Sequence, residues 1–195
     1  MYLFHRIILK LNSLWKSMIN KANVNSCIQR GMKVGKNFNT PDTVYFGTEP
    51  YLIEIGDDVN IAANVRFVNH GGTTTLLRKL PGYEDARIFG RIKIGNNCTI
   101  GLNAVITQDV QMGNNCILGA NSVLSQSMPD NCVFIGNPAQ FLCTIEDYGD
   151  VVLSNNAEYP RELEQDRKKL DLYIKANLPY KFKKARKIKS PQRKI

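Results

Sequence analysis

His70 is the residue of this chain best suited to acid–base chemistry, because it departs from the pattern around it. Seven equivalent positions along the chain carry Asn or Asp, whereas this one carries histidine. Histidine changes its charge near neutral pH, so a neutral imidazole within hydrogen-bond reach of a hydroxyl can accept its proton as the oxygen attacks an electrophile. The structural alternative is that His70 is one more corner residue, since histidine is enriched in left-handed backbone conformations.

The other residues with metal-binding or nucleophilic chemistry form no recognisable site. The chain has five cysteines and two histidines, without a CxxC or a Cys/His pair of the kind that holds structural zinc, so we expect no metal. Cys98 and Cys116 lie eighteen residues apart in equivalent positions. This spacing favours small buried thiols in a reducing compartment over a disulfide framework.

The element that must position His70 is a six-residue repeat. From Ile94 to Met128 the sequence reads IGNNCT, IGLNAV, ITQDVQ, MGNNCI, LGANSV and LSQSM, and the same phase appears earlier as IGDDVN, IAANVR and FVNHGG. An apolar residue at every sixth position cannot line an α-helix, whose apolar face recurs every three or four residues. The period predicts an all-β solenoid, a parallel β-helix with three short strands in each coil.

Each position of the repeat has its own requirement. The first position is aliphatic, Met or Phe and should point inward, and the fifth is small or modest, which leaves room in a narrow interior. The fourth position should form the corner, because Asn and Asp tolerate a left-handed backbone better than other residues with a side chain. The fourth-position residues are Asp58, Asn64, Asn97, Asn103, Asp109, Asn115 and Asn121.

The repeat is interrupted between Phe67 and Ile94. These 27 residues equal one coil of eighteen plus nine more, and we assign the surplus to an extruded loop at residues 71–87. Insertions in solenoids map to loops that often lie on the functional face. His70 lies at the base of this loop, where Gly71-Gly72 permits a sharp exit.

Four segments organise the chain. We predict an amphipathic helix at residues 1–22 and the β-helix at residues 31–142. A second helix is predicted at residues 158–178, followed by a basic tail at residues 179–195. Arg6, Lys10 and Lys16 make the first helix too charged for a membrane span, and it lacks the cleavage site of a secretory signal. Residues 1–20 either cap the open end of the solenoid or lie in a membrane interface. We expect a cytoplasmic protein, peripheral at the inner membrane face in the second case.

The net charge of +9 is concentrated at one end, because eight Lys and Arg residues and no acid lie between residues 181 and 195. Such a run is most often a solvated tail, and otherwise binds a phosphate-rich ligand or an anionic membrane. Nucleic-acid binding would rest on this tail alone, without a stacking platform or recognition motif, so we expect no nucleic-acid partner.

The runs IGNNCTIGLNAVI, GNNCILGANSVL and MPDNCVFIGNPAQ resemble the hexapeptide-repeat acyltransferases, particularly the sugar O-acetyltransferases and streptogramin-type acetyltransferases. The resemblance covers about residues 52–142. It implies a left-handed β-helix, which is an exception to the usual right-handed crossover. It also implies a homotrimer with active sites between neighbouring subunits, acetyl-CoA as the acyl donor, and His70 as the catalytic base.

The resemblance further implies where the ligands bind. Coenzyme contacts are implied for Leu102, Ala120, Ser125, Asn137, Pro138, Ala139 and Gln140. Asn39 is similar to an acceptor-binding Asn of sugar acetyltransferases, although a structural turn explains it equally well.

We expect direct transfer of an acetyl group from acetyl-CoA to a hydroxyl of a saccharide or glycoconjugate, in surface-polysaccharide biosynthesis. A covalent acyl-enzyme is disfavoured because no Cys or Ser has an evident activating partner in the sequence. The alternatives are N-acylation of an amino sugar, acetylation of an antibiotic, and a β-helix scaffold subunit without catalysis.

The basic tail gives a first test. Relatives often carry cations where this chain has Gln126 and Gln140, and those cations would meet the phosphates of coenzyme A. We expect the residues from Lys181 onward to replace them. Shortening the chain after Pro179 should then raise the KM for acetyl-CoA in a steady-state assay, because the phosphates lose their charge-assisted contacts. An unchanged KM would discard this role for the tail.

Overall fold

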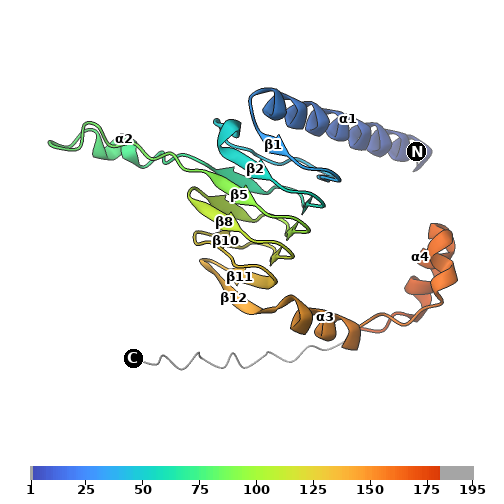
Figure 1. Ribbon diagram of the computed structural model, residues 1–195. Coiled ribbons are helices and arrows are strands. Elements are labelled where there is room, and N and C mark those ends of the chain that lie inside the picture. The colour runs from blue at the N-terminus through green and yellow to red at the C-terminus, as the bar shows by residue number, and fades with distance from the viewer. Residues whose placement is uncertain (1, 181–195) are drawn as a thin grey trace. The chain divides into compact units, whose positions relative to one another are not determined.

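The computed structural model describes residues 2–180, so most of the basic tail lies outside the described residues. The chain divides into two compact units, residues 1–151 and residues 152–195. The first unit contains a long helix and a stack of short strands (Figure 1).

The strands form three sheets that the chain visits in rotation. Sheet A contains β1 (Lys33–Val34), β2 (Ile53–Ile55), β5 (Ile92–Ile94) and β8 (Val110–Met112). Sheet B contains β3 (Asn60–Ile61), β6 (Thr99–Ile100), β9 (Ile117–Leu118), β11 (Cys132–Gly136) and β12 (Ala139–Thr144). Sheet C contains β4 (Arg66–Val68), β7 (Val105–Thr107) and β10 (Val123–Leu124). The strands pair in parallel up to β11, so each coil adds one strand to each sheet (Figure 1).

The interior is built from two positions of the repeat, as the sequence predicts. First-position side chains are at most 2% exposed: Ile55, Ile61, Phe67, Ile94, Ile100, Ile106, Met112, Leu118 and Leu124. Fifth-position side chains are equally buried: Val59, Val65, Cys98, Ala104, Val110, Cys116 and Ser122. Large and small residues therefore alternate around a closely packed core.

The predicted left-handed corners are confirmed. All seven fourth-position Asn and Asp residues have φ between 52° and 61°. Their side chains also join the coils, because Asn97 Nδ2 donates to Asn115 Oδ1 at 2.8 Å and Asn115 Nδ2 donates to Asn131 Oδ1 at 2.9 Å. The corner residue thus supplies both a backbone conformation and a hydrogen-bonded ladder.

Neighbouring positions explain why the coils stack so closely. Asn114 Oδ1 accepts a hydrogen bond from the backbone N–H of Asn96 at 2.8 Å, which ties one coil to the next. Glycine precedes these residues because the backbones nearly touch. A Cβ atom on Gly95 would lie 2.6 Å from the carbonyl oxygen of Gly113.

The strand register corrects the expected length of the interruption. Phe67 pairs with Ile106, 39 residues on, whereas Val105 pairs with Val123, 18 residues on. All of the extra residues between β4 and β5 therefore belong to one insertion, and no further coil lies within it. The insertion projects from the stack and contains the short helix α2 (Thr74–Leu77) (Figure 1).

The N-terminal helix is longer than expected. α1 spans Tyr2–Gln29 and continues to a glycine, Gly31, whose φ of 99° ends it. Only its last part caps the coils: Cys27 is buried, and the side-chain amides of Asn20 and Asn23 donate to the carbonyl oxygens of Thr40 and Val44. Within the described residues, no helix has the length and apolar content needed to cross a bilayer.

The chain reverses after the last coil, which the sequence did not predict. β12 runs antiparallel to β11, and a helix, α3 (Ile145–Ser154), follows it. The predicted helix over 158–178 is also shorter in the structure. A 3-10 turn, η2 (Arg161–Gln165), precedes α4 (Arg167–Asn177), because the Asp166 side chain accepts from the N–H groups of Lys168 and Lys169 and sets the helix start.

Replacing one corner residue should separate the two roles of these asparagines. Asn115→Ala puts alanine, which tolerates a left-handed backbone less well than asparagine, at φ 54° and removes both ladder hydrogen bonds. We expect a loss of about 2–3 kcal/mol in the free energy of unfolding, measured by urea denaturation at fixed protein concentration. Asn115→Gly loses the same hydrogen bonds but tolerates the left-handed backbone, so it should be less destabilised. Equal or greater stability of the alanine variant would contradict this account of the corners.

Candidate active site

Two insertions meet at one corner of the stack, the corner between sheets C and A. The first coil is displaced by 21 residues from the second, as in the pairing of Lys33 with Glu54, and its extra residues lie between Phe46 and Ile53. The long insertion leaves the second coil at the same corner, after β4. The extra residues of both coils therefore lie at the same corner.

His70 closes the base of the long insertion. It pairs with Phe89 in an antiparallel bridge, flanked by hydrogen bonds from Gly71 N–H to Ile88 O and from Gly90 N–H to Asn69 O, both 3.0 Å. Its backbone is outside the left-handed region that all seven Asn and Asp corners adopt. The interpretation of His70 as a further corner residue is therefore wrong, because strand-like pairing with the returning chain holds it extended.

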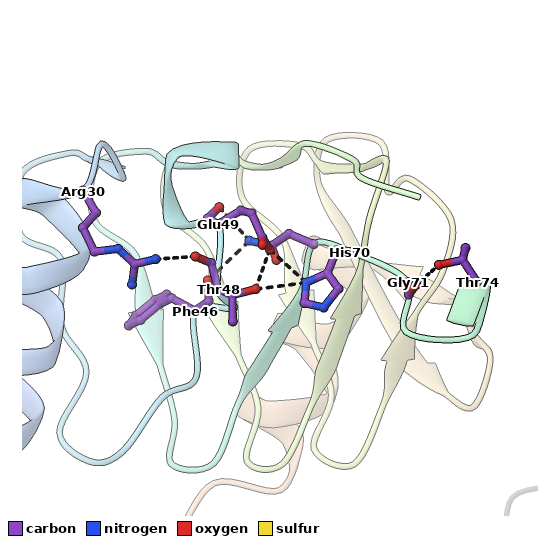
Figure 2. Close-up of polar contacts among 8 residues, drawn as sticks. Arg30, Phe46, Thr48, Glu49, His70, Gly71 and Thr74 are labelled. Atoms are coloured by element: carbon purple, nitrogen blue, oxygen red, sulfur yellow. Dashed lines mark hydrogen bonds and ion pairs between the residues drawn. The ribbon is translucent and has the colours of Figure 1, made fainter. Parts of the chain in front are cut away.

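The imidazole of His70 is held by a carboxylate. Its Nδ1 lies 2.8 Å from Glu49 Oε2, and Thr48 Oγ1 donates to the same carboxylate oxygen at 2.7 Å (Figure 2). A carboxylate only accepts hydrogen bonds, so we assign the imidazole proton to Nδ1. Nε2, on the ring edge away from Glu49, then carries the lone pair. The His70 side chain is 39% exposed and that of Glu49 only 18%, so the ring is reachable while its partner is covered.

The turn that carries Glu49 is fixed from three directions. Asn69, fully buried beside His70, donates from Nδ2 to the backbone oxygen of Glu49 at 2.7 Å. Gly47 makes room for Asn69, because a Cβ atom on Gly47 would lie 2.4 Å from Asn69 Oδ1. The φ of Gly47 is 71°, which also favours glycine. The Arg30 guanidinium, beyond the end of α1, donates to the carbonyl oxygen of Thr48 (Figure 2). Both members of the Glu49–His70 pair are thus positioned by backbone as well as by side chains.

A surface depression opens beside His70. It is lined by Glu49, His70 and residues of the insertion between Gly71 and Phe89. Arg78 and Arg87 give its wall positive charge, and their guanidinium groups donate to Thr74 Oγ1 and to the carbonyl oxygen of Ala86, respectively. Neither arginine forms an ion pair with a carboxylate among residues 2–180. A ligand here would meet one base and two cationic groups.

The coenzyme-contact residues predicted from the family resemblance lie along the two edges of sheet C. Leu102 and Ala120 stack at the edge shared with sheet B, where Asn121 N–H donates to Leu102 O at 2.8 Å. The turn containing Asn137, Pro138 and Ala139 joins β11 to β12 beside them, with Gly136 N–H bonded to Ser122 Oγ. Gln140 follows on β12 and pairs with Ile135.

Ser125 lies at the other edge of sheet C, after β10, which is the edge that also carries His70 after β4. The next residue, Gln126, donates from Nε2 to the carbonyl oxygen of Ala139 at 2.9 Å, which links the two edges. The predicted coenzyme residues and the predicted base therefore border one face, although no contact between them tests their roles.

Asn39 lies elsewhere. Its backbone bridges to Asn60 in sheet B, and its Nδ2 donates to Asn60 Oδ1 at 2.8 Å. It lines a separate depression beside Lys21 and Val24 of α1. Within one chain the structure does not bring Asn39 to the His70 depression, and its role in acceptor binding stays a prediction.

Burial makes most of the cysteines poorly placed to act as an alternative nucleophile. Four of the five are buried, and the Sγ atoms of Cys98, Cys116 and Cys132 donate to backbone carbonyl oxygens. Burial raises the pKa of the Cys132 thiol, which favours the unreactive protonated form. No group of three or more potential metal ligands occurs in the described part of the chain.

Glu49 is the site residue that sequence reasoning missed. It precedes His70 by 21 residues and lies in an irregular coil, so the six-residue repeat gives no hint of their contact. The available signal was the spacing of the apolar residues in the first coil. Matching Phe46 to Phe67, whose rings stack with centroids 5.4 Å apart, would have aligned Thr48-Glu49 with Asn69-His70.

Comparisons with known proteins agree with the repeat. The family described as bacterial transferase hexapeptide (six repeats) matches residues 91–126. Protein CapG of Staphylococcus aureus is 45% identical over 147 residues, which cover 74% of this chain and 84% of CapG.

Two solved enzymes share the fold. A maltose O-acetyltransferase from Clostridium difficile 630 is 31% identical with a TM-score of 0.52, and the match covers 58% of this chain and 59% of that enzyme. A galactoside acetyltransferase in complex with coenzyme A is 29% identical with a TM-score of 0.51, covering 67% of this chain and 61% of that enzyme. This chain thus spans about three-fifths of the length of either enzyme. With the repeat, the stacked coils and the extensive identity to CapG, the chain belongs to the hexapeptide-repeat acyltransferase family.

Proposed function

We propose that this protein transfers an acetyl group from acetyl-CoA directly to a hydroxyl of a saccharide or glycoconjugate, with His70 as the general base. The observation that carries the proposal is the Glu49–His70 pair at the mouth of the depression, with Nδ1 held at 2.8 Å and Nε2 turned away from its partner. Such a pair is suited to removing a proton from a weakly acidic hydroxyl.

The proposed reaction has one chemical step on this chain. Nε2 takes the acceptor hydroxyl proton while the oxygen attacks the thioester carbonyl, and the thiolate of coenzyme A leaves. The ring then carries positive charge, which the Glu49 carboxylate stabilises through Nδ1–H. The protonated ring returns its proton to the departing thiolate. Direct transfer fits the thiols of this chain, of which four are buried and so shielded from the donor.

The choice of donor and acceptor rests on the family and on the names of its members. A galactoside acetyltransferase was solved with coenzyme A, and a maltose O-acetyltransferase shares 31% identity with this chain. Both names describe sugar acetylation, which favours a saccharide over an antibiotic as acceptor. Surface-polysaccharide biosynthesis in the cytoplasm is the setting we propose for it.

Family membership also supports the finer features of the fold. We propose that the coils wind as a left-handed β-helix and that three copies assemble, so that an adjacent copy completes the coenzyme site along the face bordered by Leu102, Ala120 and Ser125. The acceptor would enter at the His70 depression.

Removing the imidazole tests the base. His70→Ala should lower kcat by at least about a hundredfold with acetyl-CoA and the best acceptor from a saccharide panel scored by mass spectrometry, since general bases supply about 10²–10⁴-fold. His5→Ala provides a matched control, because His5 lies on α1 and does not line the depression. Near-normal turnover by a folded His70→Ala would exclude the assignment. Absence of transfer by the unaltered protein across the panel would favour a scaffold.

Glu49 should act as a positioning residue. Glu49→Gln keeps the shape of the side chain but removes the charge that stabilises the protonated ring. Hydrogen bonds to charged groups contribute about 1.5–3 kcal/mol, so kcat should fall by roughly ten- to a hundredfold.

The KM for acetyl-CoA should stay unchanged in Glu49→Gln, and Glu49→Asp, which restores the charge, should recover part of the rate. A purely structural role would instead lower the melting temperature and raise the KM of both variants alike. That second pattern would contradict the positioning role.

A further inference from the structure

The first sixteen described side chains of α1 form a large apolar surface that this chain does not cover. Every side chain from Phe4 to Ile19 is exposed in the single chain, and burial begins at Asn20. Nine of the exposed residues are large and apolar, with 48–66% of their surface exposed: Leu9, and a set of eight that comprises Phe4, Ile7, Ile8, Leu11, Leu14, Trp15, Met18 and Ile19. A stable protein leaves such a surface exposed only where it meets a partner.

These eight residues lie on one side of the helix. At 3.6 residues per turn they occupy an arc of about 140°, which we call the apolar stripe. The residues that dock α1 on the coils are Asn20, Asn23, Val24 and Cys27. The centre of the docking face is rotated by about 160° from the centre of the stripe. The stripe therefore faces away from the coils that the same helix caps, and capping cannot explain it.

The charges around the stripe favour a negatively charged partner. Residues 1–41 contain seven Lys and Arg and no Asp or Glu. On the helix, Lys10 and Lys21 border one edge of the stripe. A second copy of α1 packed on the stripe would bring these cations against one another without an acidic partner. A partner with an apolar interior and a negatively charged surface would match both the apolar stripe and the lysines beside it.

We propose that the apolar stripe of α1 docks on an anionic lipid surface, with the helix lying in the plane of the interface. The apolar side chains would enter the boundary between headgroups and acyl chains while the lysines meet lipid phosphates, as interfacial amphipathic helices do. Trp15, whose ring suits the headgroup level, lies within the stripe. The His70 site belongs to a separate part of the same unit, so this proposal stands independently of the reaction.

The chain contains its own reporter, because Trp15 is the only tryptophan. Full-length protein is titrated with vesicles of phosphatidylcholine containing phosphatidylglycerol, and with vesicles of phosphatidylcholine alone. We expect a blue shift of Trp15 emission and co-flotation with the anionic vesicles, both weakened by salt. Unshifted emission and no flotation with anionic vesicles would overturn the proposal.

Two leucines give a matched pair of variants. Leu11 is 60% exposed within the stripe, and Leu9 is 66% exposed on the opposite side of the same helix. Leu11→Gln should raise the dissociation constant for anionic vesicles by about tenfold, whereas Leu9→Gln should leave it nearly unchanged. Equal effects of the two substitutions would contradict docking through the stripe. If the Trp15 emission shifted with protein concentration and did not change on addition of vesicles, the stripe would bind a second copy of the chain, and the proposal of a lipid partner would be wrong.

Discussion

Backbone hydrogen bonds between successive coils are the constraint on which this structure depends. Each strand is only two or three residues long through most of the stack, so it is stable only when its neighbours above and below align with it. The corners must therefore turn at the same place in every coil. Asn and Asp at left-handed φ do this, and their side chains repeat the same contact from coil to coil. Extra residues are tolerated only where a corner can bulge without moving a strand.

This constraint explains how the proposed catalytic pair can form on a repetitive scaffold. Both insertions leave the stack between sheets C and A, one in each of two adjacent coils. The short insertion brings Glu49, and the long one begins at His70. The strands beneath hold the two side chains in register, with Phe46 stacked on Phe67 and Asn69 bonded to the Glu49 carbonyl. The Glu49–His70 pair, although carried by two insertions, is thus held in place by the strands of the coils.

The parts of the fold that depend on local sequence could be predicted, and those that depend on coil pairing could not. The buried first position and the left-handed fourth position follow from each six-residue unit by itself. The contact of Glu49 with His70 requires knowing that the first coil is longer than the others. The pairings of Lys33 with Glu54 and of Tyr45 with Arg66 reveal this, whereas the six-residue repeat does not. The same lack of register led to the wrong coil count between Phe67 and Ile94. The antiparallel return of β12 over β11 is likewise a pairing event that no periodicity encodes.

The most direct test of the proposed chemistry is the tautomer of His70, which decides whether Nε2 can act as a base. With two histidines in the chain, the ring nitrogens can be assigned by 15N NMR of the protein and of the His5→Ala variant. In the neutral ring we expect the proton on Nδ1, facing Glu49, and a 15N shift at Nε2 typical of an unprotonated nitrogen. A neutral His70 ring protonated at Nε2 would contradict the account, because that nitrogen could not accept the proton of an acceptor hydroxyl.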